Sequence, residues 1–238
     1  MKIFVTGASG WIGSATVDEL LRAGHEVVGL ARSEASAAAV EAKGAQVLRG
    51  DLDDLDSLRR GAAESDAVVH LANKHDFEHP EVSNRAERAA VELFAEELSG
   101  TGRPFLLASG VAGLAQGRPS VESDVSSAVG PDSMRGGAEN LALDAVADGL
   151  HAVSVRFAPT THGVGDHGFV ALIADAARRA GVSGYVDDGE TGWAAVHVDD
   201  AARLIRLGVE SAPPGTKLHA VGEESVRTRD IAEAIGEA

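Results

Sequence analysis

A glycine-rich turn follows the first apolar segment and constrains the fold of this chain more than any other feature. Residues 2–6 are typical of a buried strand, and Gly7, Gly10 and Gly13 lead from it into a helical stretch, 11–23. In such a turn the first glycine allows a tight bend, the second admits a pyrophosphate, and the third lets the helix pack on the sheet. The helix N-terminus then directs free N–H groups at the phosphates. The turn therefore predicts nucleotide binding, with a purely structural turn as the alternative.

Short apolar strands alternate with longer helical stretches along most of the chain, which predicts a parallel sheet wrapped by helices. The strands are expected at 2–6, 26–30, 46–48, 66–71, 105–108 and 151–156, with helices at 11–23, 34–43, 82–98 and 133–147. Beyond residue 157 the pattern is less regular, with helices expected at 169–180, 200–209 and 230–238 and strands near 185 and at 217–221. We therefore expect an α/β fold, with a Rossmann-type doubly wound parallel sheet over 1–156. A small C-terminal substrate-binding lobe is expected over 157–238, with segments returning to the sheet, in one structural unit.

Composition narrows the classes of partner. A net charge of −16 disfavours nucleic acid and anionic membranes, so a small-molecule substrate is expected. The chain has no cysteine, which excludes disulfides, thiolate metal sites and a cysteine nucleophile. It has no apolar run of the roughly 18 residues that a membrane span needs. Because the chain enters a strand directly at its start, we expect no signal peptide and a cytoplasmic location. The last helical stretch ends without a stop signal, so the sequence leaves open whether the chain is truncated.

The end of the second expected strand bears on the choice of cofactor. An acidic residue about 20 positions after the glycines would bind the ribose 2′-hydroxyl of NAD. This chain has Arg32 and Ser33 there, which can pair with a 2′-phosphate and add a hydrogen bond. The prediction is NADP(H) rather than NAD(H). The alternative is that Arg32 is a solvated side chain and Ser33 only caps the next helix.

Topology predicts the remaining cofactor contacts, because ligands of an open α/β sheet lie at the carboxyl ends of its strands. Asp51 and Leu52 are expected near the adenine, although Asp51 could instead cap a helix that starts near Leu52. Ser109 is expected to point toward the nicotinamide. The predicted cofactor-binding set is Gly7, Ser9, Gly10, Trp11, Ile12, Gly13, Arg32, Ser33, Asp51, Leu52, Leu71, Ala72 and Asn73.

Five further motifs follow the glycine turn in order along nearly the whole chain. They are Gly50-Asp51-Leu52, His70-Leu71-Ala72, Leu107-Ala108-Ser109, Arg156 and His197-Val198-Asp199-Asp200-Ala201. With Thr6 and the glycines, they make the chain resemble the extended short-chain dehydrogenase/reductase family, the NAD-dependent epimerase/dehydratase group. The resemblance implies a Rossmann fold, a nicotinamide cofactor and proton transfer by a tyrosine with a lysine four residues later. It also implies a serine or threonine beside the substrate oxygen, for which Ser109 is the candidate, although a shift of one residue would place Gly110 there.

The chain departs from that family in its proton relay. Its single tyrosine, Tyr185, is followed four positions later by Gly189, and its lysines are Lys2, Lys43, Lys74 and Lys217. Our alignment places Arg135 at the tyrosine position and Glu139 at the lysine position. The sequence therefore predicts an atypical active site in which water or a histidine transfers the proton.

Two polar loops offer replacements for the missing pair. His75 and His162 are candidate acid–base residues, with Asp76 or Asp166 as orienting carboxylates, because histidine titrates near neutral pH. The alternative is that these are ordinary polar loop residues. The predicted substrate pocket comprises Lys74, Asp76, Asp166, His167, Phe169, Tyr185 and Trp193. Tyr185 has half-buried packing as its alternative role, and the ligand spacing supports no metal site.

We expect an NADP(H)-dependent oxidoreductase that transfers a hydride to or from a small carbonyl, alcohol or conjugated substrate. Two alternatives stay open. One is a non-catalytic NADP(H)-binding protein with a redox-sensing or regulatory role, and the other is a non-redox isomerase or lyase on the same fold. The resemblance also implies a homodimer, formed through the helices 82–98 and 133–147.

Overall fold

The main body of the protein is a parallel sheet whose chain reversal lies at its centre. The computed structural model describes residues 1–76 and 78–237, and within them seven strands pair in the order β3-β2-β1-β4-β5-β6-β9, all parallel. These strands are β1 (Lys2–Thr6), β2 (Glu26–Ala31), β3 (Gln46–Arg49), β4 (Ala67–His70), β5 (Pro104–Gly110), β6 (His151–Phe157) and β9 (Lys217–Ala220). The chain starts at β1, proceeds outward to β3, and then returns to β4 on the other side of β1. The carboxyl ends of β1 and β4 therefore flank the crevice where such sheets bind ligands.

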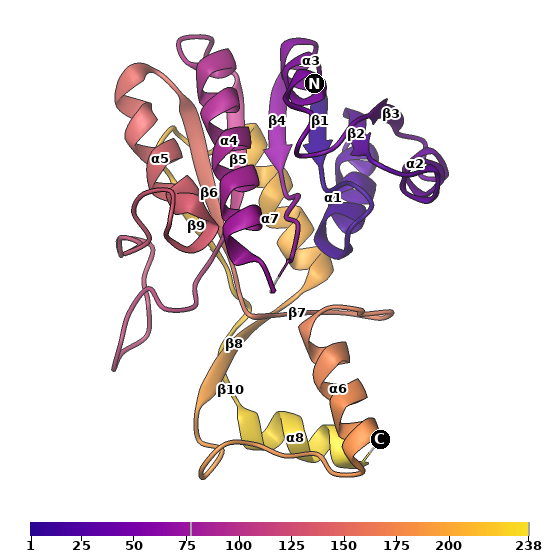
Figure 1. Ribbon diagram of the computed structural model, residues 1–238, viewed down its shortest axis with the longest axis vertical. Helices are drawn as coiled ribbons and strands as arrows, with labels where there is room; N and C mark the ends of the chain where they lie inside the picture. Colours follow the sequence, from indigo (N-terminus) through magenta and orange to yellow (C-terminus); the bar gives the residue numbers. More distant parts are fainter. Residues whose placement is uncertain (77, 238) are drawn as a thin grey trace.

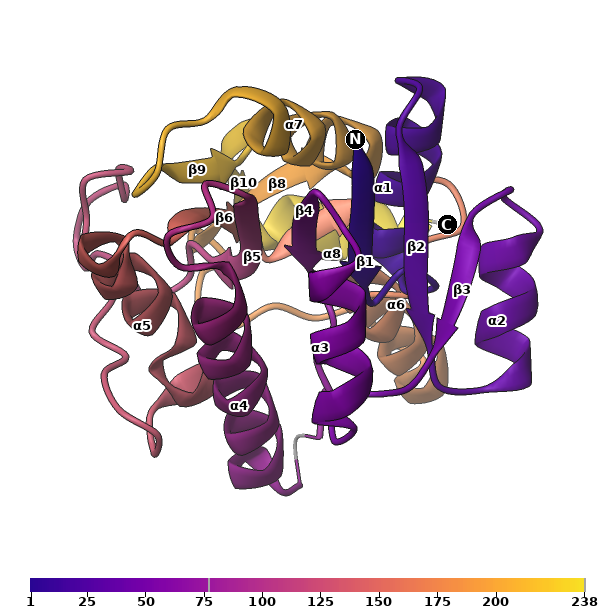
Figure 2. The ribbon, with the colours of Figure 1, turned by 90° about the horizontal axis from the view of Figure 1, so that it is seen from above.

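Helices cover both faces of this sheet (Figure 1 and Figure 2). They are α1 (Trp11–Arg22), α2 (Glu34–Glu41), α3 (Leu55–Ala63), α4 (Pro80–Leu98), α5 (Ala138–Asp144) and α7 (Val198–Ser211). Alternate residues of β1 serve the two faces, because Ile3 packs in the cluster with α1 and α7 and Phe4 in the cluster with α3, α4 and α5. Burial on both faces explains why the strands are continuous apolar runs rather than alternating ones.

A smaller lobe lies beyond the carboxyl end of the sheet (Figure 1). It contains β7 (Thr160–His162), β8 (Gly192–His197), β10 (Glu223–Arg227), α6 (Phe169–Ala180) and α8 (Thr228–Glu237). Its strands pair in the order β10-β8-β7, with β7 parallel and β10 antiparallel to β8. The chain leaves the lobe through α7 and β9 and returns to it in β10, so the lobe is built from several separate segments. Among the described residues, no helix is long and apolar enough to span a bilayer.

The α/β architecture and the Rossmann-type parallel sheet expected from the sequence are confirmed. The strand expected near Tyr185 is wrong, because this segment turns at Asp187 with φ 51° and the next strand starts only at Gly192. The strand β10 was not predicted. The helix expected at 133–147 is interrupted, since η1 (Met134–Gly137) precedes α5 and η2 (Ala145–Asp148) follows it. Within η1, Arg135 and Gly136 have φ values of 54° and 61°, which a regular helix cannot accommodate.

Candidate functional site

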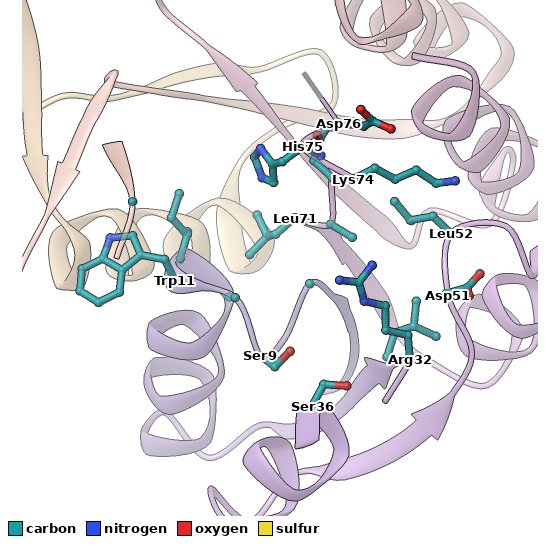
Figure 3. A pocket seen from close by; sticks show the side chains of 18 of the residues that line it. Ser9, Trp11, Arg32, Ser36, Asp51, Leu52, Leu71, Lys74, His75 and Asp76 are labelled. Carbon is teal, nitrogen blue, oxygen red and sulfur yellow. Dashed lines mark hydrogen bonds between the residues drawn. The ribbon is translucent and has the colours of Figure 1, made fainter. Parts of the chain in front are cut away.

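A cleft of about 740 Å³ opens at the carboxyl ends of β1 to β4 and extends to the lobe (Figure 3). The residues predicted from the sequence that line it are Gly7, Ser9, Gly10, Trp11, Ile12, Gly13, Arg32, Asp51, Leu52, Leu71, Ala72, Asn73, Lys74, His75, Asp76 and Phe169. The sequence did not identify ten others, which are Leu30, Ser36, Gly50, Asp53, Val82, Phe157, Ala158, Pro159, Thr161 and Gly168. One continuous wall therefore joins the glycine turn to the first residues of the lobe.

The glycine turn is packed so tightly that side chains cannot replace its hydrogens. Gly7 has φ +71°, and a Cβ there would lie 2.8 Å from the backbone nitrogen of Ala72. A Cβ on Gly13 would lie 1.9 Å from the carbonyl oxygen of Gly7. Gly10 is the N-cap of α1 and supplies no side-chain cap, so the first N–H groups of that helix face the cleft. This cradle fits the pyrophosphate of a dinucleotide.

Arg32 lies at the end of the cleft that is away from the lobe, near Ser36 and Asp51 (Figure 3). In the part of the chain that the structure describes, its guanidinium has no hydrogen bond or ion pair to a neighbour. The Asp51 carboxylate accepts the backbone N–H groups of Asp53 and Asp54, at 2.8 and 3.1 Å. Asp51 therefore closes a turn, and the N-cap of α3 is Asp54 rather than Asp51.

Ser33 lies beside this end of the cleft without forming part of its wall. Its hydroxyl accepts the backbone N–H of Ser36 at 3.1 Å and caps α2, as the alternative interpretation of this residue expected. Arg49 donates to the Ser33 carbonyl at 2.7 Å and pairs with Glu34. Two arginines thus converge here, of which Arg49 is engaged by the loop and Arg32 is directed into the cleft.

Lys74 and His75 follow β4 and diverge (Figure 3). The Lys74 side chain extends toward Leu52, and its ammonium lies 2.7 Å from both carboxylate oxygens of Asp53. Lys74, expected in the substrate pocket, therefore borders the end of the cleft that holds Arg32. The His75 ring lies on the side toward Trp11, and burial, reinforced by the charge of Arg135, lowers the pKa of His75 from its ordinary value.

The lobe end of the cleft is mostly apolar. Its wall includes Val82, Phe157, Ala158, Pro159 and Phe169. The Phe169 ring centroid lies 5.0 Å from that of Trp193, which stands behind the wall. The Asp76 carboxylate accepts the backbone N–H groups of Glu78 and His79, so it holds the start of α4.

A buried carboxylate contacts Asn73 behind the cleft wall, and it was not predicted from the sequence. Glu87 is on α4 with no exposed surface, and it accepts a hydrogen bond from Arg135 at 2.6 Å and from Asn73 at 3.3 Å. Its helical spacing in the sequence could have indicated burial, because it shares one face of α4 with Ser83, Ala86, Ala90, Val91 and Phe94. A carboxylate on such a face requires a buried partner.

The positions aligned with the family's tyrosine and lysine carry two separate ion pairs. Arg135 pairs with Glu87, as described above. Glu139 accepts from the Arg156 guanidinium at 2.6 Å and from the Ser154 hydroxyl, and both charged side chains are buried. Neither Arg135 nor Glu139 forms part of the cleft wall described above.

The remaining candidates lie outside this wall. Ser109 is the penultimate residue of β5 and is in register with Arg156 of β6. His162 faces Glu223 at 4.0 Å and His197 in the lobe, and Asp166 accepts the N–H of Gly168 at 2.6 Å. Tyr185 packs beneath the Arg229 guanidinium, 5.6 Å from its ring centroid. Residues 1–76 and 78–237 contain no group of three or more metal-ligating side chains.

Trp11 ties the glycine turn to the lobe. Its indole N–H donates to the carbonyl oxygen of Thr161 at 2.8 Å, and its ring meets that of His167 edge-on at 5.3 Å. The predicted pocket residue His167 therefore contacts the outer side of the turn, where it lines a second cavity of about 300 Å³.

Comparison with known proteins identifies relatives of the whole chain. The sequence profile of the NAD dependent epimerase/dehydratase family matches residues 3–219. The uncharacterized protein YLL056C of Saccharomyces cerevisiae is 44% identical over 100% of this chain and 80% of its own length. The 4-hydroxy-2-methyl-3-oxo-4-farnesyl-3,4-dihydroquinoline-1-oxide ketoreductase of Stigmatella aurantiaca is 30% identical over 90% of this chain and 66% of its own.

Solved structures show the same fold. The UDP-glucose 4-epimerase of Thermus thermophilus, in complex with NAD, matches with a TM-score of 0.77 at 23% identity. The match covers 100% of this chain and 83% of that one. Relatives of this chain thus include reductases and epimerases, and structural neighbours bind a nicotinamide dinucleotide.

Proposed function

Because the chain belongs to the NAD-dependent epimerase/dehydratase family, we propose that it is an NADP(H)-dependent oxidoreductase acting on a small carbonyl, alcohol or conjugated substrate. The observation that carries the cofactor choice is Arg32, a cation in the cleft wall that no described carboxylate neutralises. A 2′-phosphate there would gain a charge-assisted hydrogen bond, whereas a bare ribose would not.

The lobe end of the cleft supports an apolar substrate. Phe157, Pro159 and Phe169 offer apolar surface, and the nearby Asp76 carboxylate disfavours anionic groups such as a sugar-linked diphosphate. The name of the Stigmatella relative, a ketoreductase, agrees with carbonyl chemistry. Bound nicotinamide supplies or accepts a hydride at the substrate carbon, and the protein must then move one proton at the substrate oxygen. His75 is the acid–base side chain in the wall for that step.

The test is a calorimetric titration of the purified chain with NADPH and with NADH. We expect tighter binding of NADPH, and we expect Arg32→Ala to weaken NADPH binding about 10- to 100-fold, since a bond to a charged group contributes roughly 1.5–3 kcal/mol. NADH binding should change little. The matched control is Arg49→Ala, which removes a neighbouring guanidinium that the loop already engages.

Turnover is then measured as NADPH oxidation over a panel of aliphatic and aromatic carbonyls. Equal NADPH affinity in wild type and Arg32→Ala would contradict the NADP(H) assignment. Tight binding without turnover of any carbonyl would instead favour the regulatory alternative, in which the cleft binds the dinucleotide and performs no chemistry.

A further inference from the structure

Glu87 places a buried carboxylate on the core face of α4. Its side chain lies on the core face of α4 with no exposed surface, where an apolar residue would pack without desolvating a carboxylate. Its two oxygens are nevertheless engaged, by Arg135 at 2.6 Å and by Asn73 at 3.3 Å. A third polar group, Nε2 of the fully buried His70, lies 3.8 Å from the carboxylate. A carboxylate held this way fixes the groups around it.

His70 joins this carboxylate to the end of β1. Its Nδ1 lies 2.8 Å from the Thr6 hydroxyl, which also accepts the backbone N–H of Ala72 at 3.2 Å. Because the hydroxyl already accepts that bond, it is free to donate its own hydrogen to Nδ1. Burial lowers the pKa of His70, so the ring stays neutral with Nε2–H toward Glu87.

On the cleft side, Asn73 connects Glu87 to His75. The Asn73 side chain donates to Glu87 and accepts the backbone N–H of His75 at 2.8 Å. His75 and Arg135 have φ values of 51° and 54°, and they are two of three described non-glycine residues with positive φ. Arg135 is held in that conformation by a hydrogen bond from its backbone N–H to the Asn84 side chain, at 2.8 Å. Two strained residues are thus linked to one carboxylate, Arg135 directly and His75 through Asn73, and such strain persists only where the surroundings hold it.

We propose that Glu87 and Arg135 are positioning residues that hold His75, through Asn73, as the group that exchanges a proton with the substrate oxygen. This inference rests on the proposed function. It makes His75, held by Glu87 and Arg135, the substitute for the proton relay of the family's tyrosine and lysine.

The proton balance is simple. In carbonyl reduction, the carbonyl carbon would receive a hydride from the reduced nicotinamide, the π electrons would move to oxygen, and an imidazolium N–H of His75 would protonate that oxygen. His75 is left neutral and takes a proton back from solvent through the open cleft. In alcohol oxidation, neutral His75 accepts the hydroxyl proton as the hydride leaves the carbon.

The charged groups that face His75 act on it in opposite directions. Burial and Arg135 lower its pKa, and Glu87 raises it. The adjacent Asp76 carboxylate accepts the backbone N–H groups of Glu78 and His79, just before α4. Replacing Arg135 with a neutral side chain should therefore raise the pKa of His75, and replacing Glu87 with one should lower it.

The experiment uses four full-length variants, Glu87→Gln, Arg135→Gln, Arg135→Lys and His75→Asn. The substrate is the fastest carbonyl of the panel. We expect His75→Asn to lower kcat at least about 100-fold, as removal of a general acid does. Glu87→Gln and Arg135→Gln should lower kcat about 10- to 100-fold with unchanged NADPH affinity, and Arg135→Lys should recover most of the loss. Arg88→Gln is the matched control, because Arg88 donates to the Gly136 carbonyl in the same turn without touching Glu87.

A second readout needs no turnover. The pKa of His75 is measured by NMR titration of its imidazole in wild type and in the two glutamine variants. The His75 signal is assigned as the one that is absent from the spectrum of His75→Asn. Shifts of opposite sign support the inference, since a general loss of structure would not produce them. Unchanged kcat in both variants, or shifts of the same sign, would overturn it. Wild type that binds NADPH without reducing any carbonyl would overturn the proposed function as well, and failure of the glutamine variants alone would leave that function standing.

Discussion

Arg135 and Glu139 are four positions apart in the chain, and each forms an ion pair, Arg135 with Glu87 and Glu139 with Arg156. The surroundings of the two pairs differ sharply. Glu139 and Arg156 are 7% and 0% exposed, so that pair is buried between α5 and β6. Glu87 is fully buried, but its partner Arg135 is 29% exposed and lies behind the cleft wall. A sealed ion pair can only fix structure, whereas a pair that reaches toward a cleft can also act on what binds there. Burial of a charged pair is therefore not sufficient to assign its role.

Removing the sealed carboxylate should have the largest effect on stability. Glu139→Ala leaves Arg156 charged and fully buried, and it deprives Ser154 of its acceptor. We expect the free energy of unfolding to fall by roughly 3–5 kcal/mol, measured by urea denaturation. Glu92→Ala is the control, because its exposed pair with Arg88 on α4 should contribute at most about 0.5 kcal/mol. A loss below about 1 kcal/mol for Glu139→Ala would remove the contrast between the two pairs.

Breaking the second pair should cost less stability and more activity. Arg135→Ala leaves Glu87 with the Asn73 hydrogen bond. We expect a loss of about 1–3 kcal/mol, the usual cost of an unsatisfied buried charged acceptor. Urea denaturation and carbonyl turnover, measured on the same preparations, should rank Glu139→Ala and Arg135→Ala in opposite orders once each variant is assayed fully folded. The same order in both measurements would mean that the pairs have one common role.

Acidification should act on both pairs through their histidine neighbours. His70 lies beside Glu87 and His219 beside Arg156, and burial lowers the pKa of each below its ordinary 6.5. The unfolded chain therefore takes up protons below pH 6.5 that the folded chain refuses, so stability is full above 6.5 and falls as the pH drops. We expect His219→Asn to flatten this fall in urea midpoints measured from about pH 7.5 to 5. An unchanged slope would show that His219 is not a source of the pH dependence.

Local patterns were sufficient to predict much of the fold. The helix expected at 169–180 has those bounds because Gly181, with φ 68°, ends it cleanly. The glycine turn could also be predicted, since the atoms that leave no room for a side chain at its glycines lie within a few residues or directly after the neighbouring strand of the sheet. The interruption of the expected helix at Arg135 could not be predicted from the local sequence, because the conformation of Arg135 depends on Asn84 and Glu87, about 50 positions earlier. The direction of Lys74 was also out of reach, since its partner Asp53 comes from the loop after another strand.

The indole of Trp11 gives this molecule an optical property of its own. The chain contains two tryptophans. Trp11 is part of the cleft wall, and Trp193 contacts the wall residue Phe169. Trp11 follows Gly10 in the glycine turn and donates a hydrogen bond to the lobe at Thr161, whereas Trp193 lies behind the apolar end against Phe169. We expect emission from Trp11 to change when a dinucleotide is added and emission from Trp193 to change when a substrate contacts Phe169. The two tryptophans therefore offer label-free probes with which the proposed binding of a dinucleotide and of a substrate can be followed separately.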